Sequence, residues 1–336
     1  MDTYTFEDVF ANTQVECKFP GLDTVVREAK EEHTTEKSVF FPGCSFLNYA
    51  LPLVGAVYKT LMDQGVVDGI SLLCCGKILS YEINGEEVRR NFEDQLIERL
   101  VEVGCERLVC ACPNCVGALR AAFARDERVA HIELVPLATV LHDLGYEVNA
   151  DMAQQIFARR VAEDKWYSGQ ITDEATFNAE IANAPQVKFA VHDSCPDRNY
   201  GEFAESIRQI VPDTLWVDPE HCRKTSVCCG SLPRAAGKVA QADKCAKLNE
   251  TEALAAGANA IVTPCVSCCF QLLMAQDLPT FHYLELLYGW AINWREVDGL
   301  MKLRFLFDET LGAIDERGNR AFQGINAPDA PAAPVI

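Results

Sequence analysis

Short apolar stretches alternate with longer amphipathic stretches along most of the chain. The clearest amphipathic stretch is Glu86–Val103, where apolar residues recur about every four positions before Gly104. This spacing predicts a helix with one buried face. Short apolar stretches on either side, Ile70–Leu73 and Arg107–Val109, predict buried strands. Strands and helices in alternation are typical of βαβ units with a parallel sheet.

The same pattern predicts most of the remaining elements. Residues 1–36 are charged and weakly patterned, so we expect an irregular or helical extension there. Residues 150–186 predict a mostly helical segment with a loop near Ser168. Further strands are expected at 38–41, 132–135, 188–191, 226–227 and 260–263, and further helices at 51–64, 137–144, 203–210 and 238–256.

Ten cysteines repeat as two sets of five. Each set has a single cysteine, then a Cys-Cys-Gly, then a Cys-x-x-Cys. The gaps are 29 and 36 residues in the first set and 32 and 35 residues in the second. An Asn-Tyr pair also follows each leading cysteine, at Asn48 and at Asn199. Self-similarity at this scale indicates an internal duplication. The first set is Cys44, Cys74, Cys75, Cys112 and Cys115, and the second is Cys195, Cys228, Cys229, Cys265 and Cys268.

The duplication predicts an α/β protein with two homologous βαβ-type domains, each with a short parallel sheet, related by a pseudo-twofold axis. All the repeated cysteines follow predicted strands, so they should meet at one edge of each sheet. We expect an N-terminal extension at 1–37, a first cysteine-rich domain at 38–149, a helical linker or insertion at 150–186, a second cysteine-rich domain at 187–295, and a C-terminal helix and disordered tail at 296–336.

Composition narrows the possible partners and location. The chain has 336 residues, 49% of them hydrophobic, which suits globular domains of ordinary size. Its net charge of −19 argues against a nucleic-acid partner, whose phosphates need a basic face. We expect neither a membrane span nor an N-terminal signal segment. A cytoplasmic location is therefore expected.

Sixteen cysteines in such a protein suggest metal binding or redox chemistry, because disulfides are rare in reducing compartments. A zinc site needs four ligands around one ion. Each set offers five thiols, including an adjacent pair, and this favours a multi-iron cluster over zinc.

The doubled motif resembles the CCG cysteine-rich domain. This domain occurs in tandem in the disulfide-cleaving iron–sulfur component of heterodisulfide reductases, and also in iron–sulfur proteins that serve lactate and glycolate oxidation. The resemblance covers roughly residues 38 to 290. It implies that each set of five cysteines holds one [4Fe-4S] cluster of the non-cubane type. In heterodisulfide reductases the two clusters flank the site where a disulfide is cleaved.

The resemblance implies an oxidoreductase subunit that acts on a sulfur group and reduces or forms a disulfide. The alternative is an electron-transfer subunit of an enzyme complex that oxidises lactate- or glycolate-type 2-hydroxy acids. A metal-stabilised scaffold without redox chemistry is a third possibility. No ferredoxin-type CxxCxxCxxxCP run is present. We therefore expect a separate ferredoxin-like iron–sulfur subunit, similar to the electron-delivering one of heterodisulfide reductases, a flavoprotein subunit, and a small thiol or disulfide substrate.

Other residues near the two sets are open to two interpretations. His192 and His221 could donate a proton to a departing thiolate, but backbone contacts that satisfy each ring are the more ordinary role. Basic residues near the sets could bind an anionic thiol or form ordinary surface charge: these are Lys77, Arg198, Arg223, Lys224 and Arg234. Cys105, Cys110 and Cys245 are expected in the core. The roles of Cys17, Cys222 and Cys269 stay open.

Overall fold

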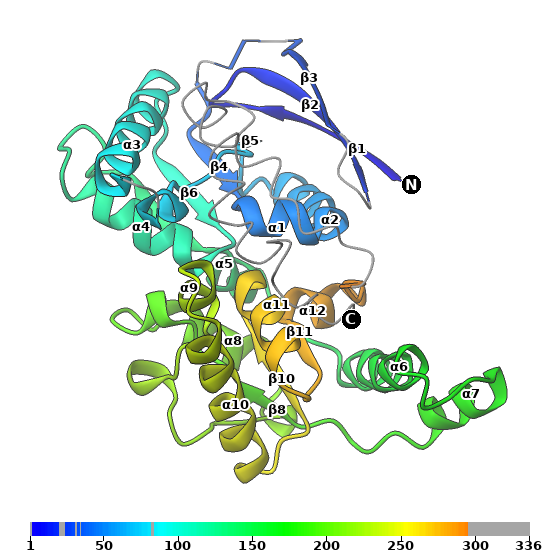
Figure 1. Cartoon of the computed structure of the whole chain (residues 1–336). Helices are drawn as coiled ribbons and strands as arrows, with labels where there is room; N and C mark the ends of the chain where they lie inside the picture. Colours follow the sequence, from blue (N-terminus) through cyan, green and yellow to red (C-terminus); the bar gives the residue numbers. More distant parts are fainter. Residues whose placement is uncertain (1, 20–23, 31, 34, 82–83, 295–336) are drawn as a thin grey trace. The chain divides into compact units, whose positions relative to one another are not determined.

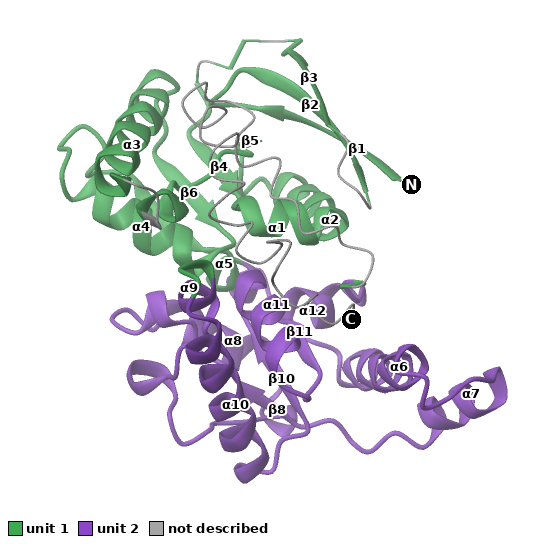
Figure 2. Ribbon diagram, viewed as in Figure 1, with its two compact units in different colours: residues 1–140, 235–237, 293–335 green, residues 141–234, 238–292, 336 purple. Residues whose placement is uncertain are grey.

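The computed structural model describes residues 2–19, 24–30, 32–33, 35–81 and 84–294 (Figure 1). The predicted C-terminal helix and tail at 296–336 lie outside these residues. The described chain forms two compact units (Figure 2). The first unit contains residues up to 140, with short returns at 235–237 and from 293, and the second contains 141–234 and 238–292. The expected domain boundaries stay predictions.

The first unit has a seven-stranded sheet in the order β3-β2-β1-β5-β4-β6-β7. The strands β1, β5, β4, β6 and β7 form parallel pairs in that order, whereas β2 is antiparallel to both of its neighbours, β1 and β3. The elements are β1 (Asp2–Asp8), β2 (Thr13–Phe19), β3 (Thr24–Glu28), β4 (Ser38–Phe41), α1 (Cys44–Tyr49), α2 (Leu51–Asp63), β5 (Gly69–Ile70), α3 (Gly85–Glu102), β6 (Arg107–Cys110), α4 (Pro113–Phe123), β7 (Glu133–Pro136) and α5 (Leu137–Asp143).

The second unit has a four-stranded parallel sheet in the order β11-β10-β8-β9. Two helices, α6 and α7, precede this sheet in the chain, as expected for 150–186. The elements are α6 (Ala150–Tyr167), α7 (Glu174–Ala182), β8 (Phe189–Val191), α8 (Glu202–Ile210), β9 (Trp216–Val217), α9 (Ser231–Ala235), α10 (Val239–Ala255), β10 (Ala260–Thr263), α11 (Val266–Ala275), β11 (Thr280–His282) and α12 (Tyr283–Tyr288).

The parallel strands follow the same order in both units, which confirms the predicted α/β class with two similar domains. The order β5-β4-β6-β7 corresponds to β9-β8-β10-β11. In each sheet the first strand of the repeat, β4 or β8, lies beside the third, β6 or β10. Chain order therefore reverses between these two strands, and loops that leave their carboxyl ends diverge there to leave room for a ligand. The pseudo-twofold relation stays a prediction.

The core lies between these strands and the helices that cover them. The β4 residues Val39, Phe40 and Phe41 are fully buried, and so is every residue of β10. Such continuous apolar strands are typical of parallel sheets covered on both faces. On α3 the predicted stripe of Phe92, Leu96 and Leu100 faces inward. The spacing of apolar residues therefore predicts both the buried strands and the inward face of α3.

Two expectations about secondary structure were wrong. Residues 1–36 contain the antiparallel strands β1–β3, and Asp8 at the end of β1 pairs with Ile70 of β5. The segment Thr13–Phe19 alternates polar with apolar residues, with Val15 and Cys17 buried, which is a strand period that its charges obscured. The expected strand at 226–227 is absent, and β9 occurs earlier, at Trp216–Val217.

Candidate metal centres

The first set of cysteines lies together at the carboxyl ends of the parallel strands. The Sγ atoms of Cys44 and Cys74 are 3.7 Å apart. Cys75 is hydrogen-bonded to Cys74 and to Cys115, and Cys115 is hydrogen-bonded to Cys112. The five thiols therefore form one continuous network, although they come from three separate loops of the first unit.

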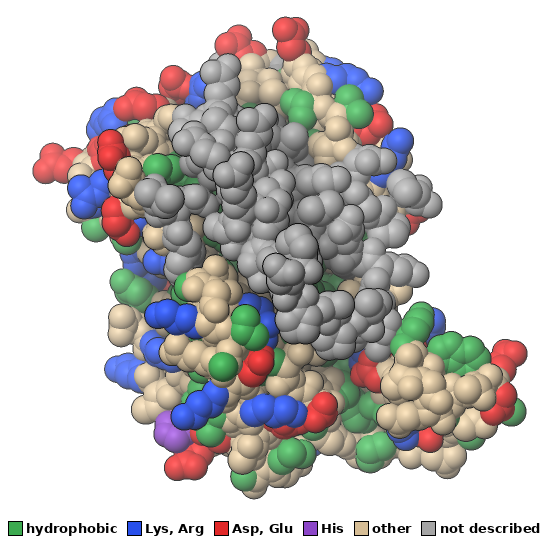
Figure 3. Space-filling view, viewed as in Figure 1, with side chains coloured by type: hydrophobic (Ala, Val, Ile, Leu, Met, Phe, Trp, Pro, Cys, Tyr) green, Lys and Arg blue, Asp and Glu red, His purple; other side chains and the backbone are tan. Residues whose placement is uncertain are grey.

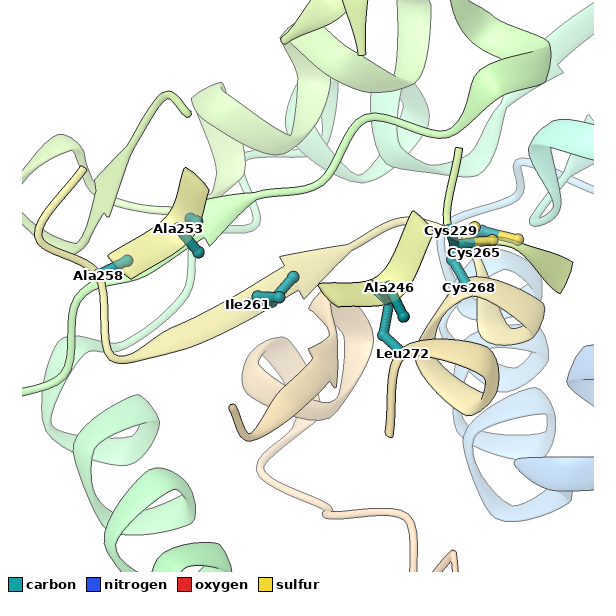
Figure 4. Packing of buried hydrophobic residues seen from close by; sticks show 9 residues of the cluster. Cys229, Ala246, Ala253, Ala258, Ile261, Cys265, Cys268 and Leu272 are labelled. Carbon is teal, nitrogen blue, oxygen red and sulfur yellow. The ribbon is translucent and has the colours of Figure 1, made fainter. Parts of the chain in front are cut away.

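The second set forms a network of the same kind within the second unit. Cys228 is hydrogen-bonded to Cys195 and Cys229, Cys229 to Cys268, and Cys268 to Cys265. Figure 4 shows Cys229, Cys265 and Cys268 gathered beyond the end of β10, beside apolar residues such as Leu272. Within each unit, the structure thus brings together the five cysteines of one repeat.

The fold positions both CxxC motifs and Cys44 at helix starts, beside the point where strand order reverses. Cys112 and Cys265 are the N-cap residues of α4 and α11, so each CxxC occupies the first turn of a helix. Cys44 is the first residue of α1. Backbone N–H groups in a first helical turn have no partner within the helix and favour negative charge nearby. These positions therefore stabilise thiolates.

The glycine of each Cys-Cys-Gly packs closely against a neighbouring helix, and its N–H contacts a thiol. Gly76 and Gly230 have φ values of 72° and 101°, which side chains rarely allow. A Cβ atom at Gly230 would lie 2.5 Å from the carbonyl oxygen of Ala242 on α10, and one at Gly76 would collide with the ring of Phe92 on α3. The N–H groups of Gly76 and Gly230 donate to Sγ of Cys74 and of Cys228, each at 3.4 Å.

The thiol networks make one cysteine of each adjacent pair acidic. Hydrogen bonds from Cys115 and Cys74 lower the pKa of Cys75 to about 5. Hydrogen bonds from Cys195 and Cys229 lower the pKa of Cys228. In contrast, hydrogen bonds to its neighbours and burial raise the pKa of Cys115. Because metals bind thiolates, a network that stabilises a thiolate is suited to metal binding.

One protein family matches the chain twice, and each match contains one of the two cysteine sets. The CCG cysteine-rich domain matches residues 38–120 and 189–273, which together make up half of the chain. The chain belongs to the CCG family. No curated protein matches it. Among solved structures, a crystal structure of glutamate racemase isoform RacE1 from Bacillus anthracis is similar at 13% identity and a TM-score of 0.30, over 76% of this chain and 79% of that chain.

The donor set in each CCG domain fits an iron–sulfur cluster. Five linked thiols exceed the four ligands of a single tetrahedral ion. All sixteen cysteines are free thiols. Each domain also has a buried polar side chain beside its thiols with atoms that lack a hydrogen-bond partner among the described residues, namely Asn48, four residues after Cys44 on α1, and His192. Such orphaned groups are uncommon in native interiors. The clustered cysteines thus point to iron–sulfur binding.

Most cysteines of each set are buried, and the others are half-buried. Cys112 in the first CCG domain is half-buried, as are Cys195 and Cys228 in the second. The other members of both sets are buried, with Cys44 the most exposed of them at 8%. A group held in either network would therefore be largely shielded from water.

Most cysteines outside the two sets are buried in the core. Cys105 and Cys110 are as buried as predicted, and Cys17 and Cys269 are also buried. Burial raises the pKa of all four thiols. Cys245 is only half-buried on α10, so the expectation of a core position was wrong for this residue. Its helix turns it partly towards solvent.

Cys222 is half-buried. Its Sγ lies 3.6 Å from Nη1 of Arg223. Arg223 also pairs with Glu205 and Asp218 at 2.6 and 2.5 Å. Arg234 is similarly held by Asp243 and by Gln271. These contacts assign both arginines to ordinary ion pairs. Figure 3 shows Lys and Arg side chains beside Asp and Glu side chains over the second unit.

The two histidines have different surroundings. His221 is half-exposed, and its Nδ1 lies 2.6 Å from Glu252. His192 is 4% exposed, and its Nδ1 lies 2.8 Å from Oδ1 of Asn249. Burial lowers the pKa of His192. The ring of His221 thus pairs with a carboxylate and not with the backbone as expected, whereas His192 keeps one ring nitrogen without a described partner.

One supporting residue, Asp8, was missed by the sequence analysis. Its buried carboxylate accepts hydrogen bonds from the N–H groups of Phe10 and Ala11 at 2.9 and 2.7 Å, and from the N–H of Leu72 and the hydroxyl of Ser71. Asp8 therefore fixes the segment that leads into Cys74 and Cys75. The only signal for this role was the apolar alternation of the neighbouring strand β2.

Proposed function

We propose that this protein is the iron–sulfur subunit of a heterodisulfide-reductase-like complex, with two non-cubane [4Fe-4S] clusters flanking a site that reduces or forms a disulfide. One observation carries the proposal. In each CCG domain five thiols form a single network at the point where strand order reverses. The proposed ligands are Cys44, Cys74, Cys75, Cys112 and Cys115 for one cluster, and Cys195, Cys228, Cys229, Cys265 and Cys268 for the other.

The residues of this chain would bind, orient and shield these groups. The N–H groups of Gly76 and Gly230 donate to thiols and offset the negative charge of bound thiolates. The first turns of α4 and α11 add further donors. When bound, an iron–sulfur cluster supplies electrons one at a time and iron atoms that can accept a sulfur ligand. A small disulfide would approach each site at its half-buried cysteines.

The partners we propose follow from the need for electrons. A ferredoxin-like iron–sulfur protein of the same complex would deliver them, and a flavoprotein would supply that protein in turn. A cytoplasmic location is part of the proposal, because free thiols persist in a reducing compartment. In the described residues, no helix has the length and apolar character needed to cross a membrane.

The test is turnover by the isolated protein. Anaerobically purified protein is supplied with reduced viologen and a small disulfide, and viologen oxidation is followed together with the release of thiol. We expect turnover by the wild type and by Cys110→Ser, and at least about a hundredfold loss for Cys229→Ser, since a cluster ligand is removed. Intact clusters without disulfide turnover would overturn the proposal in favour of electron transfer in a 2-hydroxy-acid oxidising complex. A protein without clusters would overturn both.

A further inference from the structure

The second CCG domain places an imidazole at its thiol network. His192 follows β8 directly, and its backbone N–H donates to the carbonyl oxygen of Val262 at 2.9 Å, which extends the pairing between β8 and β10. The side chain is 4% exposed. The ring is therefore held by the sheet at the carboxyl end of a central strand, three residues before Cys195.

The hydrogen bonds of Asn249 fix the tautomer of this ring. Nδ2 of Asn249 donates to the carbonyl oxygens of Cys228 and Cys245 at 3.2 and 2.8 Å. Since carbonyl oxygens only accept, the other side-chain atom of Asn249, Oδ1, must face His192. Oδ1 also only accepts, so Nδ1 of His192 carries the proton at this 2.8 Å contact. In a neutral ring, Nε2 is then left with a lone pair.

The buried imidazole lies beside two thiols, and its Nε2 has no hydrogen-bond partner among the described residues. A ring nitrogen of His192 and the Sγ atoms of Cys229 and Cys268 lie within 4.8 Å of one another. Nδ1 is occupied by Asn249, and Nε2 is buried without a partner among the described residues. A histidine whose other nitrogen donates to a neighbouring oxygen is the usual arrangement of a metal-binding imidazole.

The first CCG domain has no such nitrogen at the corresponding place. Phe41 lies three residues before Cys44, as His192 lies three residues before Cys195, and it is fully buried at the end of β4. The two thiol networks are therefore alike, but the position three residues before the leading cysteine carries an apolar ring in the first domain and an imidazole in the second.

We propose that Nε2 of His192 is a nitrogen ligand of the metal group held by the second cysteine set, beside Cys229 and Cys268. The inference rests on the proposed iron–sulfur function, and it makes the two sites chemically distinct. Because both sets keep five cysteines, the imidazole would be an additional neutral donor to the second metal group and would not replace a thiolate. Since ligand identity tunes the potential of an iron–sulfur cluster, the two clusters should differ in reduction potential. Asn249 is a positioning residue for this ligand.

The test combines pulsed EPR with isotope labelling. Wild-type protein is prepared anaerobically with natural histidine and with ¹⁵N-histidine, and nitrogen couplings are measured in the paramagnetic state of the clusters. We expect one strong nitrogen coupling that changes from ¹⁴N to ¹⁵N on labelling. The coupling should vanish in His192→Phe, which copies Phe41, and persist in the matched control His221→Phe. The potential of one cluster should shift in His192→Phe, while that of the other stays unchanged.

Two outcomes would overturn the inference, and neither is confused with failure of the proposed function. Clusters present by iron and sulfide analysis, but without a histidine coupling in the wild type, would remove His192 as a ligand and leave the proposed function standing. If the protein holds no cluster, Co²⁺ added to the apoprotein serves as the probe. Identical Co²⁺ spectra for the wild type and His192→Phe would then exclude the nitrogen ligand. Should His192→Phe fail to fold, the labelled wild type decides alone.

Discussion

The two CCG domains share their thiol networks and differ in what supports them. Both have the same order of parallel strands, a CxxC in the first turn of a helix, and a glycine N–H that donates to a thiol at 3.4 Å. The first network is supported by Asp8 from the added antiparallel strands. The second is bordered by His192 and Asn249. The two domains thus share the cysteine arrangement that could hold a metal group, but different residues surround that arrangement in each domain.

The two Asn-Tyr pairs also differ between the domains, because only the first pair is buried. Asn48 and Tyr49 are buried on α1 after Cys44. Asn199 and Tyr200 are exposed, because Cys195 begins only a short 3₁₀ turn that ends at Asp197. The repeated Asn-Tyr pair therefore indicates common ancestry of the two domains, but the pair does not have the same structural role in both.

The largest effect is expected from removing one ligand. Cys229→Ser should remove the second cluster and spare the first, so that iron content falls by about half, because each network lies within a single unit. Cys75→Ser should do the reverse. Iron and acid-labile sulfide analysis with EPR checks both. Cys110→Ser is the control, and loss of iron from this variant would contradict the ligand assignment.

The second prediction compares the two glycines. Gly230→Ala should destabilise its domain by about 3–5 kcal/mol, because the new Cβ would lie 2.5 Å from the carbonyl oxygen of Ala242, which is backbone and cannot turn away. Gly76→Ala should cost less, about 1–3 kcal/mol, since the ring of Phe92 can shift. Urea unfolding measures both. Equal losses would contradict this difference between the helices that pack on the two glycines.

The third prediction concerns the support that only the first domain has. Asp8→Ala should cost about 2–4 kcal/mol, because it leaves the buried N–H groups of Phe10 and Leu72 without an acceptor. Cluster loss on mild heating should then affect the first site before the second, as followed by EPR. Asp213→Ala, at the start of a surface 3₁₀ turn, is the matched control. A variant that loses both clusters together would show that the domains are coupled.

The smallest effect is a pH dependence in the second domain. Burial raises the pKa of Glu285 to about 7 from its ordinary value of 4.5. The native state thus binds this proton more tightly than the unfolded chain does. The resulting stability is fully present below pH 4.5 and is lost as pH rises through about 7, by on the order of 3 kcal/mol. Urea midpoints measured across this range should fall for the wild type and stay flatter for Glu285→Gln. Equal slopes would contradict the assignment.

The sequence predicted what depends on period and spacing. The stripe on α3 and the apolar residues of β10 located both elements, because helix and strand periods are local properties. The spacing of cysteines after predicted strands predicted that each set would meet at a sheet edge, as the first thiol contact, between Cys44 and Cys74, illustrates. The ligand assignment itself stays a prediction.

Features that depend on tertiary contacts could not be predicted in this way. Leu72 and Asp8 are sixty-four positions apart, and His192 and Asn249 are fifty-seven apart. No local pattern announces either hydrogen bond. The strand expected at 226–227 was wrong because β propensity over two residues is too weak a signal to outweigh the turn at 223–225 that precedes Ser226.

The most direct test of the account is metal analysis of the anaerobically purified wild-type protein, with EPR of its oxidised and reduced forms. The account predicts about eight iron atoms and as many acid-labile sulfides per chain, with two cluster signals that differ in reduction potential. About four irons would mean that only one CCG domain holds a cluster, which would contradict the equivalence of the two thiol networks. Zinc without labile sulfide would contradict the redox function as a whole.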